Sequence, residues 1–311
     1  MSFTTDVKNE LARVEPTCTH CDKAMLAALV RIEGSLVLTG KGGMRLEIDT
    51  DSPNVARLMV RLLHTIYSLE TELVVRRSVL HKTPNYLISV PAQAKLPESL
   101  RDLGVLGDTG FEAGISKKLI AKNCCAAAYL RGVFLARGFV SNPRGDFHFE
   151  MTVESEELAR DIADLLHERG INARYLQRRN NYIVYLKSGT AISDFLALVG
   201  AHQCALAMES ERVIKSVRND VNRRVNADVA NQKKASDAGI DQIIMINKVV
   251  GHYGFENLSP ALQEFIRLRA AHPDASLKEL GEYADPKLSK SAVYHRVRRL
   301  EQMAEQINSP S

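Results

Sequence analysis

Apolar residues in the first two thirds of the chain follow two different periods. In the segments that begin at Ser52 and Ser155, they recur every three or four residues, which is the spacing of one buried helix face. In shorter segments, apolar and polar residues alternate, as they do in strands with one buried face. The alternating segments are RLEIDT, ELVVRRSV, FHFEMTV, ARYLQRR and YIVYLK. These two periods together predict an α+β fold with amphipathic helices on its sheets.

The pattern occurs twice, at a constant offset of about 104 residues over most of its length. The matching positions are Gly34 with Gly138, Asp51-Ser52 with Glu154-Ser155, Ala56-Arg57 with Ala159-Arg160, and Leu62-Leu63-His64 with Leu165-Leu166-His167. Each copy reads as helix, two strands, helix, two strands, helix. The first helix of each copy is expected over residues 22–33 and 123–137. The chain therefore contains an internal repeat of the form αββαββα.

From Ser210 the hydrophobic pattern changes. Valines recur every fourth residue, at Val213, Val217, Val221, Val225 and Val229, and this spacing predicts a long helix with one narrow apolar stripe. A break is expected near Gly239. The helix is basic and is followed by Lys233 and Lys234, so two interpretations stay open: a solvated linker, or a helix that follows a phosphate backbone through residues that include Arg223 and Arg224.

The last segment predicts three short helices. Ser259 and Pro260 are typical of a helix start, and the sequence SLKE from Ser276 to Glu279 is a capping box. Ser289 is expected to cap a third helix whose inner face carries apolar residues at helical spacing: Val293, Val297, Leu300 and Met303. Helices of these lengths, joined by a short turn, are typical of a helix-turn-helix, whose last helix enters the major groove of DNA.

The outer side of that third helix has the chemistry of a DNA-reading surface. Side chains near its start are placed to reach base edges, and later basic side chains are placed to reach phosphates. The predicted DNA-binding residues are Lys287, Ser289, Lys290, Ser291, Tyr294, His295, Arg296, Arg298 and Arg299. The alternative is a solvated basic helix in a small bundle.

Composition adds little to this picture. The formal net charge is +4 and the isoelectric point about 8.7, which only weakly favours a nucleic-acid partner. The N-terminal stretch has no apolar core of the kind that a secretory signal carries, and no uncharged apolar run reaches the roughly 18 residues that span a bilayer. A cytoplasmic protein without a membrane anchor or a small-molecule substrate is expected.

The five cysteines are an odd number in a long chain, which favours reduced thiols over a disulfide framework. Cys18 and Cys21 have the spacing of metal ligands, but no second pair follows at a zinc-finger distance. The adjacent Cys124 and Cys125 precede the second repeat and could complete a composite site. We favour ordinary buried thiols and expect no metal and no cofactor, but the sequence leaves open whether Cys18 and Cys21 bind a metal.

Both repeats begin with a helix that resembles the LAGLIDADG helix of homing endonucleases, in LAALVRIEG and LRGVFLARG. Small residues, among them Ala28 and Gly132, would let two such helices pack closely. In that family, a carboxylate before the final glycine of each helix binds a divalent metal ion. The corresponding positions are Glu33 and Arg137. Because a guanidinium cannot ligate a metal, the resemblance implies a degenerate metal site without nuclease activity, and Glu33 is expected to pair with Arg137.

The sheets of such a fold offer a second surface for DNA. The second repeat carries Arg174, Arg178 and Arg179 among tyrosines, and the first carries Arg45, Arg76 and Arg77. Acidic residues in both repeats dilute this positive charge: Glu47, Asp49 and Glu150. A solvated charged face and a secondary DNA contact are both compatible with this pattern. The possible secondary contacts are Arg223, Arg224, Lys233, Lys234, Arg174, Arg178 and Arg179.

The order of these parts, and above all the segment SVRNDVNRRVNADVANQKKASDAGIDQI, resembles the WhiA family over essentially the whole chain. The resemblance implies a sequence-specific DNA-binding transcriptional regulator of cell division, chromosome segregation and sporulation. Such a regulator would bind promoters through its C-terminal module, lie in the cytoplasm at the nucleoid, and have a non-catalytic endonuclease-like domain. For actinobacterial members it implies a WhiB-type iron–sulfur partner, whose cluster belongs to that partner.

We therefore expect an α+β chain with a two-copy LAGLIDADG-like αββαββα domain, a long helical linker and an all-α helix-turn-helix domain. The expected boundaries are residues 1–110 for the first half with its N-terminal helix, 111–208 for the second half, 209–250 for the linker and 251–311 for the DNA-binding domain. The alternatives are a metal-dependent LAGLIDADG endonuclease and a protein-binding scaffold.

Overall fold

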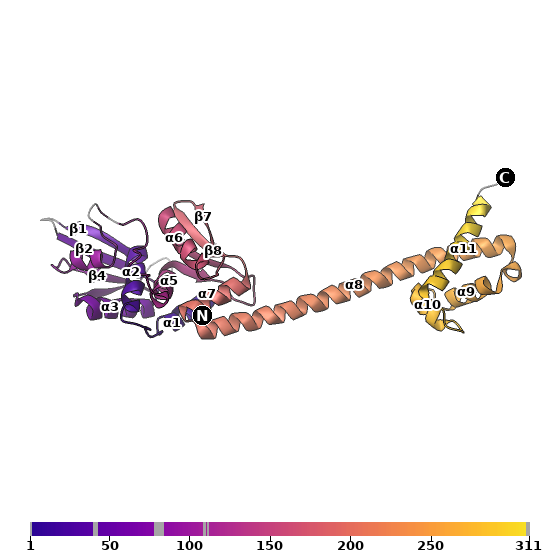
Figure 1. The fold of residues 1–311 in the computed structure, drawn as a ribbon, viewed down its shortest axis with the longest axis horizontal. Helices are drawn as coiled ribbons and strands as arrows, with labels where there is room; N and C mark the ends of the chain where they lie inside the picture. Colours follow the sequence, from indigo (N-terminus) through magenta and orange to yellow (C-terminus); the bar gives the residue numbers. More distant parts are fainter. Residues whose placement is uncertain (1, 40–42, 78–83, 108–109, 111, 309–311) are drawn as a thin grey trace. The chain divides into compact units, whose positions relative to one another are not determined.

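The structure is a computed structural model, and it describes residues 2–39, 43–77, 84–107, 110 and 112–308. The chain divides into two compact units, Met1–Lys215 and Ser216–Ser311. Figure 1 labels the helices and strands. Among the described residues, no helix is both long and apolar enough to cross a bilayer.

The first unit contains the two predicted repeats. Its elements up to the second repeat are α1 (Phe3–Leu11), α2 (Cys21–Glu33), β1 (Gly34–Thr39), β2 (Gly43–Thr50), α3 (Pro53–Tyr67), β3 (Glu72–Arg77), β4 (Pro84–Val90) and α4 (Leu96–Asp102). The second repeat consists of α5 (Asn123–Arg137), β5 (Gly138–Val140), β6 (Phe149–Val153), α6 (Glu156–His167), β7 (Arg174–Arg178), β8 (Asn181–Leu186) and α7 (Gly189–Val199).

The repeat is confirmed by the topology of the sheets. Both are antiparallel, and their strand orders, β1-β2-β4-β3 and β5-β6-β8-β7, are the same order in two copies. The matched glycines, Gly34 and Gly138, each begin a strand directly after the first helix. The middle helices start as expected, since the Ser52 and Ser155 hydroxyls accept hydrogen bonds from the backbone at Val55 and Leu158. The last two residues of the predicted strand ELVVRRSV, at positions 78 and 79, lie outside the described residues.

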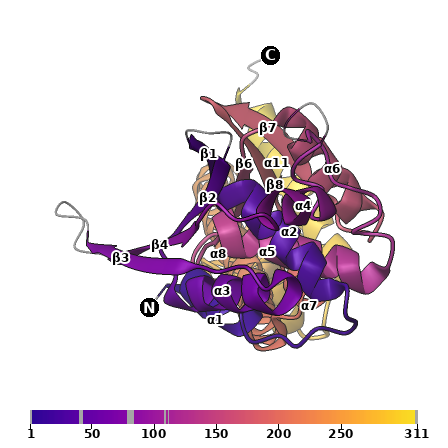
Figure 2. The same ribbon diagram turned by 90° about the vertical axis from the view of Figure 1, so that its left-hand side faces the viewer.

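Helices α2 and α5 pack against each other between the two sheets (Figures 1 and 2). A Cβ atom at Gly132 would lie 2.5 Å from the backbone oxygen of Met25 and 2.8 Å from Cβ of Ala28. Glycine is therefore required for this close approach of the two helices. Almost every side chain of α5 from Cys125 to Ala136 is buried. The helix pair is the centre of the hydrophobic core of the first unit.

Helix α8 runs without interruption from His202 to Tyr253, so the predicted break near Gly239 is wrong. A Cβ at Gly239 would lie 2.0 Å from the backbone oxygen of Pro273, in the loop that follows α9. The glycine allows that loop to approach α8, and the helix continues through it. The valine stripe is solvent-exposed, with Val213 at 53% and Val229 at 60%.

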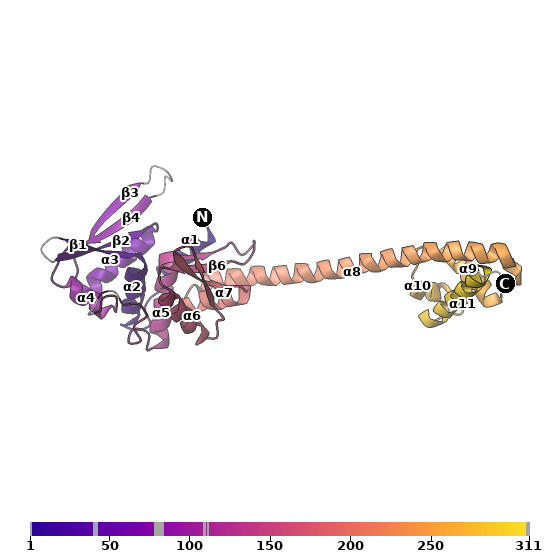
Figure 3. The ribbon, with the colours of Figure 1, turned by 90° about the horizontal axis from the view of Figure 1, so that it is seen from above.

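The second unit packs short helices against the last turns of α8 (Figure 3). They are the 3₁₀ helix η2 (Phe255–Asn257), α9 (Pro260–Ala271), α10 (Leu277–Tyr283) and α11 (Lys290–Asn308). Ile246 and Val249 of α8 are buried in the same core. Arg269 is 1% exposed and anchors the loop after α9, because its Nη1 donates to the backbone oxygens of His272, Pro273 and Ala275. The last part of the predicted linker is thus a structural component of the second unit.

Candidate nucleic-acid interface

Helix α11 has one buried face and one exposed face. Its first turn is capped as predicted, because the Ser289 hydroxyl accepts a hydrogen bond from the backbone N–H of Ala292 at 3.2 Å. Val293, Val297 and Leu300 are buried, and Met303 packs against the same core. The opposite face is exposed and carries six of the nine predicted residues: Lys290, Ser291, Tyr294, His295, Arg298 and Arg299. Lys287 and Ser289 are also exposed and lie in the turn just before the helix.

Arg296, the ninth predicted residue, has a different role. Its Nη1 lies 2.8 Å from Oε2 of Glu264 on α9, and its side chain is only 17% exposed. The guanidinium is thus already paired within the protein and holds α11 to α9. Sequence spacing alone cannot show that a carboxylate on another helix pairs with Arg296, and a phosphate contact of this residue stays a prediction.

The remaining cations of α11 are available to a polyanion. In the described part of the chain, no ion pair involves Lys287, Lys290 or Arg299. Arg298 lies 3.0 Å from Glu301 one turn later, but both side chains are well exposed, so this ion pair is weak. A phosphate can therefore compete with Glu301 for Arg298, and the exposed face has a clear excess of positive charge.

The turn before α11 is fixed against α10. The capping box is present, with the Ser276 N–H donating to Oε2 of Glu279 at 2.7 Å and the Glu279 N–H donating to the Ser276 hydroxyl at 3.4 Å. The Leu288 N–H donates to the backbone oxygen of Gly281 at 2.9 Å, which ties the end of the turn to α10. A rigid turn is what a helix-turn-helix needs to present its last helix at a defined angle.

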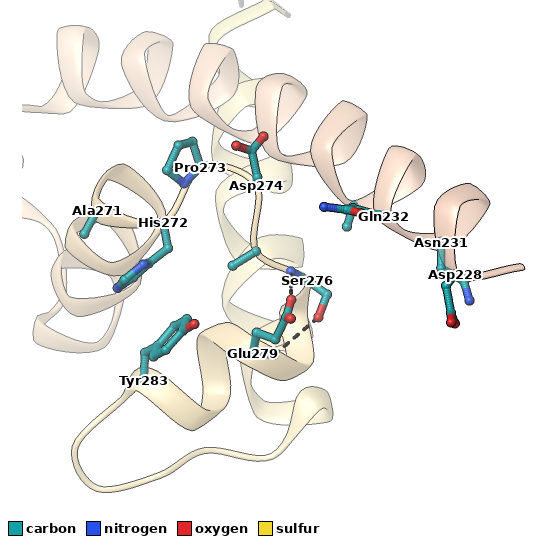
Figure 4. Close-up of a pocket in the computed structure, with 12 residues that line it drawn as sticks. Asp228, Asn231, Gln232, Ala271, His272, Pro273, Asp274, Ser276, Glu279 and Tyr283 are labelled. Carbon is teal, nitrogen blue, oxygen red and sulfur yellow. Dashed lines mark hydrogen bonds between the residues drawn. The ribbon is translucent and has the colours of Figure 1, made fainter. Parts of the chain in front are cut away.

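A polar hollow of about 710 Å³ lies between α8 and the loop that connects α9 to α10 (Figure 4). Its wall includes stacked rings of His272 and Tyr283, with centroids 4.1 Å apart. Two of its carboxylates are hydrogen-bonded within the protein: Glu279 in the capping box, and Asp274, whose Oδ1 accepts from Ser236 at 2.8 Å. Carboxylates on this wall disfavour the binding of a phosphate.

In the first unit, the ends of α2 and α5 meet at Glu33 and Arg137. Nε of Arg137 lies 3.5 Å from Oε2 of Glu33, and its Nη1 lies 2.9 Å from Oε1 of Glu154. The expected ion pair between the two helices is therefore present. Burial raises the pKa of Glu33, while Arg137 and Lys8 act in the opposite direction. A carboxylate beside two cations is a poor ligand for a divalent metal ion.

The exposed faces of the two sheets carry different charge. In the second sheet, the register places Arg174 and Arg178 on the same face as Tyr185, beside a hollow of about 550 Å³. On the corresponding face of the first sheet, Arg45 and Arg76 alternate with acidic side chains: Glu47, Asp49 and Glu72. Arg179 is exposed in the turn between β7 and β8. Glu150 also lies on this face of the second sheet, beside Tyr185. Among the described residues, basic side chains outnumber acidic ones there but not on the first sheet, so the two sheets do not form one continuous basic surface.

The predicted cations of α8 are all exposed. Arg223 and Arg224 follow an acidic residue, Asp220, which pairs with Arg223. Lys233 and Lys234 lie two to three turns further along the helix. They are exposed and, among the described ion pairs, none involves them. These four residues can add phosphate contacts but lie outside the helix-turn-helix itself.

The structure brings four of the five cysteines together. The sequence left such a composite site open but favoured ordinary buried thiols. Cys18 and Cys21 lie at the start of α2, and Cys124 and Cys125 lie in the first turn of α5. Burial raises the pKa of Cys125 to about 12, whereas a hydrogen bond from the His20 backbone lowers the pKa of Cys18 to about 6. This cluster lies within the first unit and is separate from the basic faces.

Three protein-family models match the chain. The WhiA N-terminal LAGLIDADG-like domain matches residues 19–106, the WhiA LAGLIDADG-like domain matches residues 126–218, and the WhiA C-terminal HTH domain matches residues 221–304. The last match begins within α8, in agreement with the packing of that helix against α9 to α11. Together, the three matches cover both repeats and the helix-turn-helix.

Two relatives share the full arrangement. The "Probable cell division protein WhiA" of Heliobacterium modesticaldum is 42% identical over 307 residues, which is 98% of this chain and 96% of that protein. The protein of the same name from Desulforamulus reducens is 42% identical over 312 residues, or 99% of this chain and 97% of that one. The crystal structure of full-length DUF199/WhiA from Thermotoga maritima superposes with a TM-score of 0.60 at 24% identity, covering 98% of this chain and 99% of that one, and so shares the fold.

Proposed function

The chain belongs to the WhiA family, and from that membership we propose that it is a non-enzymatic, sequence-specific regulator that binds double-stranded DNA at promoters. The observation that carries the proposal is the exposed face of α11 with the turn before it, where Lys287, Lys290 and Arg299 are free of ion pairs among the described residues. A duplex carries one negative charge for about every 1.7 Å of its axis, so such a face binds it through phosphates.

Specificity in this proposal comes from the first turns of α11. Ser291, Tyr294 and His295 are exposed beside the cations and can donate hydrogen bonds to base edges. The Ser289 hydroxyl already accepts a bond from the backbone and therefore contributes to the helix start more than to base contact. The cations of α8 and of the second sheet add phosphate contacts that carry no sequence information.

The endonuclease-like unit is non-catalytic in this proposal. Metal-dependent phosphodiester cleavage needs acidic oxygens from both helices, and Arg137 occupies one of the two positions. The guanidinium neutralises Glu33, the remaining carboxylate, from a distance of 3.5 Å. Plasmid incubated with the full chain and Mg²⁺ should therefore remain intact, and cleavage that Glu33→Ala abolishes would establish the endonuclease alternative.

The biological setting is carried over from the family. We propose a role in cell division and chromosome segregation, with sporulation where the host sporulates, and a location in the cytoplasm at the nucleoid. A WhiB-type iron–sulfur protein is the proposed partner in hosts that have one. The proposed function involves neither a membrane nor a small-molecule substrate.

The decisive experiment compares DNA binding by the full chain and by two double variants. Duplexes are first selected by the chain from a random pool, and affinity is then measured at several salt concentrations. Lys290→Ala/Arg299→Ala should weaken binding by about 10- to 100-fold and reduce the salt dependence by about two counterions. Arg174→Ala/Arg178→Ala is the matched pair on the second sheet and should have a smaller effect.

The reverse order of effects would move the DNA surface to the endonuclease-like unit. A wild-type chain that selects no duplex from the pool would favour the protein-binding scaffold, in which the repeats bind a partner and DNA is not the ligand. Circular dichroism of each variant shows whether its fold is intact.

A further inference from the structure

The first unit contains a thiol cluster that DNA binding does not use. The Sγ atoms of Cys18, Cys21, Cys124 and Cys125 all lie within 4.8 Å of one another. Sγ of Cys18 is 3.5 Å from that of Cys21 and 3.6 Å from those of Cys124 and Cys125. Cys18 and Cys125 are 107 residues apart in the chain, so only the pairing of the two repeats brings them together.

These distances match one tetrahedral metal ion. At a Zn–S distance of about 2.3 Å, the edges of a sulfur tetrahedron are about 3.8 Å long. Disulfides would need sulfur atoms about 2.0 Å apart and would join them only in pairs. An iron–sulfur cluster is itself several atoms wide and would hold the four thiolates further apart than a single ion does. The geometry thus favours a single ion with four thiolate ligands.

The backbone directs the four side chains to one point. The Cys21 N–H donates to the backbone oxygen of Cys18 at 3.0 Å, and this turn brings the two thiols of the Cys-x-x-Cys pair to the same side. Adjacent residues of a helix point about 100° apart, so Cys124 and Cys125 can reach one point only near the helix start. Both of them lie in the first turn of α5, and Cys21 is the first residue of α2.

The surroundings also suit a negatively charged centre. Two helix N-termini meet at the cluster, and their partial positive charge stabilises thiolates. Arg131 is 7% exposed, and in the described part of the chain it makes no ion pair with a carboxylate. Burial lowers the pKa of Arg131, and the nearby Cys21 and Asp22 act in the opposite direction. A centre of four thiolates and one divalent cation would have a net charge of −2 and would compensate this buried cation.

We propose that Cys18, Cys21, Cys124 and Cys125 bind one structural Zn²⁺ ion that joins the N-terminal ends of α2 and α5. The ion links the two repeats at one end of the helix pair, and the ion pair of Glu33 with Arg137 links them at the other end. All four positions of the tetrahedron are filled by protein, so the site is structural and leaves no place for a substrate.

The test uses the full chain, purified with a reductant from cells supplied with zinc. Elemental analysis should find about one Zn²⁺ per chain, because four thiolates complete one tetrahedral site. Cys21→Ser and Cys125→Ser should lose most of this metal. Cys204→Ser is the matched control, since Cys204 is also buried but lies outside the cluster, and it should retain the metal.

A second measurement does not depend on the folding of any variant. The wild-type chain, stripped of metal under reducing conditions, is titrated with Co²⁺. A tetrahedral tetrathiolate site gives intense visible and near-ultraviolet absorption that saturates at one equivalent and disappears when Zn²⁺ is added. Removal of zinc should also lower the melting temperature of the first unit by more than about 5 °C.

Three outcomes would overturn the proposal. The first is a reduced chain that holds no metal and gives no tetrahedral Co²⁺ spectrum. The second is iron with acid-labile sulfide in the isolated chain, which would indicate a cluster. The third is a chain whose mass shows disulfides among these four cysteines and whose reduced form still fails to bind Zn²⁺, which would indicate a redox pair.

Discussion

Helices α5 and α11 are both rich in arginine, yet they place their charges in opposite ways. In α5, nearly every side chain is buried, Arg131 donates to the Val199 backbone oxygen at 2.7 Å, and Arg137 pairs with two glutamates. In α11, one face is buried and the cations on the other face point to solvent. A helix whose cations are bound within the protein holds a fold together, whereas a helix whose cations are exposed is available to a partner.

Among the changes that test this comparison, charge reversal on α11 should have the largest effect, and the quantity affected is DNA affinity. Lys290→Glu/Arg299→Glu replaces two attractions to phosphate by two repulsions, so DNA affinity should fall by more than about 100-fold. Fluorescence anisotropy with a selected duplex measures the loss. Arg137→Met on α5 is the matched control and should leave affinity unchanged within about twofold. An equal loss in that control would show that α5 also contributes to DNA binding.

A methyl group added at Gly132 should have the next largest effect, here on the free energy of unfolding of the first unit. Gly132→Ala places Cβ 2.5 Å from the Met25 backbone oxygen, and because backbone cannot move aside easily, the first unit should lose about 2 kcal/mol of unfolding free energy. Denaturant unfolding of the full chain measures the change. Gly251→Ala in α8 meets open space and should instead stabilise the second unit by about 0.5–1 kcal/mol. The same sign for both substitutions would contradict the close packing of α2 with α5.

Arg296→Ala separates stability from DNA binding within α11. Because Arg296 pairs with Glu264 at 2.8 Å in a half-buried position, its loss should reduce the stability of the second unit by about 1 kcal/mol. The salt dependence of DNA binding should remain that of the wild-type chain, since no phosphate contact is removed. Glu264→Gln should produce a similar loss of stability. A reduced salt dependence in Arg296→Ala would return this residue to the DNA surface.

Glu33→Gln should have the smallest effect, and the effect should depend on pH. Burial raises the pKa of Glu33 in the folded chain, so its ionisation lowers stability once the pH exceeds the ordinary value of about 4.3. Relative to the wild-type chain, the variant should gain up to about 1 kcal/mol at neutral pH, and this gain should vanish below the ordinary pKa. Thermal unfolding from pH 4 to pH 8 measures the difference. Glu154→Gln, at an exposed position, should show no such trend.

Local patterns were sufficient to predict much of the fold. The two periods of hydrophobicity, the repeat, the caps at Ser52, Ser155 and Ser289, and the capping box at Ser276 all depend on residues a few positions apart. Such interactions form within one helix or strand, so the sequence contains all the information about them. The same holds for the exposed face of α11, because helical spacing alone separates it from the buried valines.

Contacts between residues far apart in the chain were decided by the tertiary structure. The loop at Pro273 packs closely against the helix at Gly239, and Glu264 on α9 pairs with Arg296 on α11. The four cysteines belong to segments more than a hundred residues apart, and each segment alone is compatible with ordinary buried thiols. Periodicity specifies which face of a helix is apolar. The packing of one helix against another decides which side chains meet, because the spacing of residues along the chain does not encode the distance between side chains on different helices.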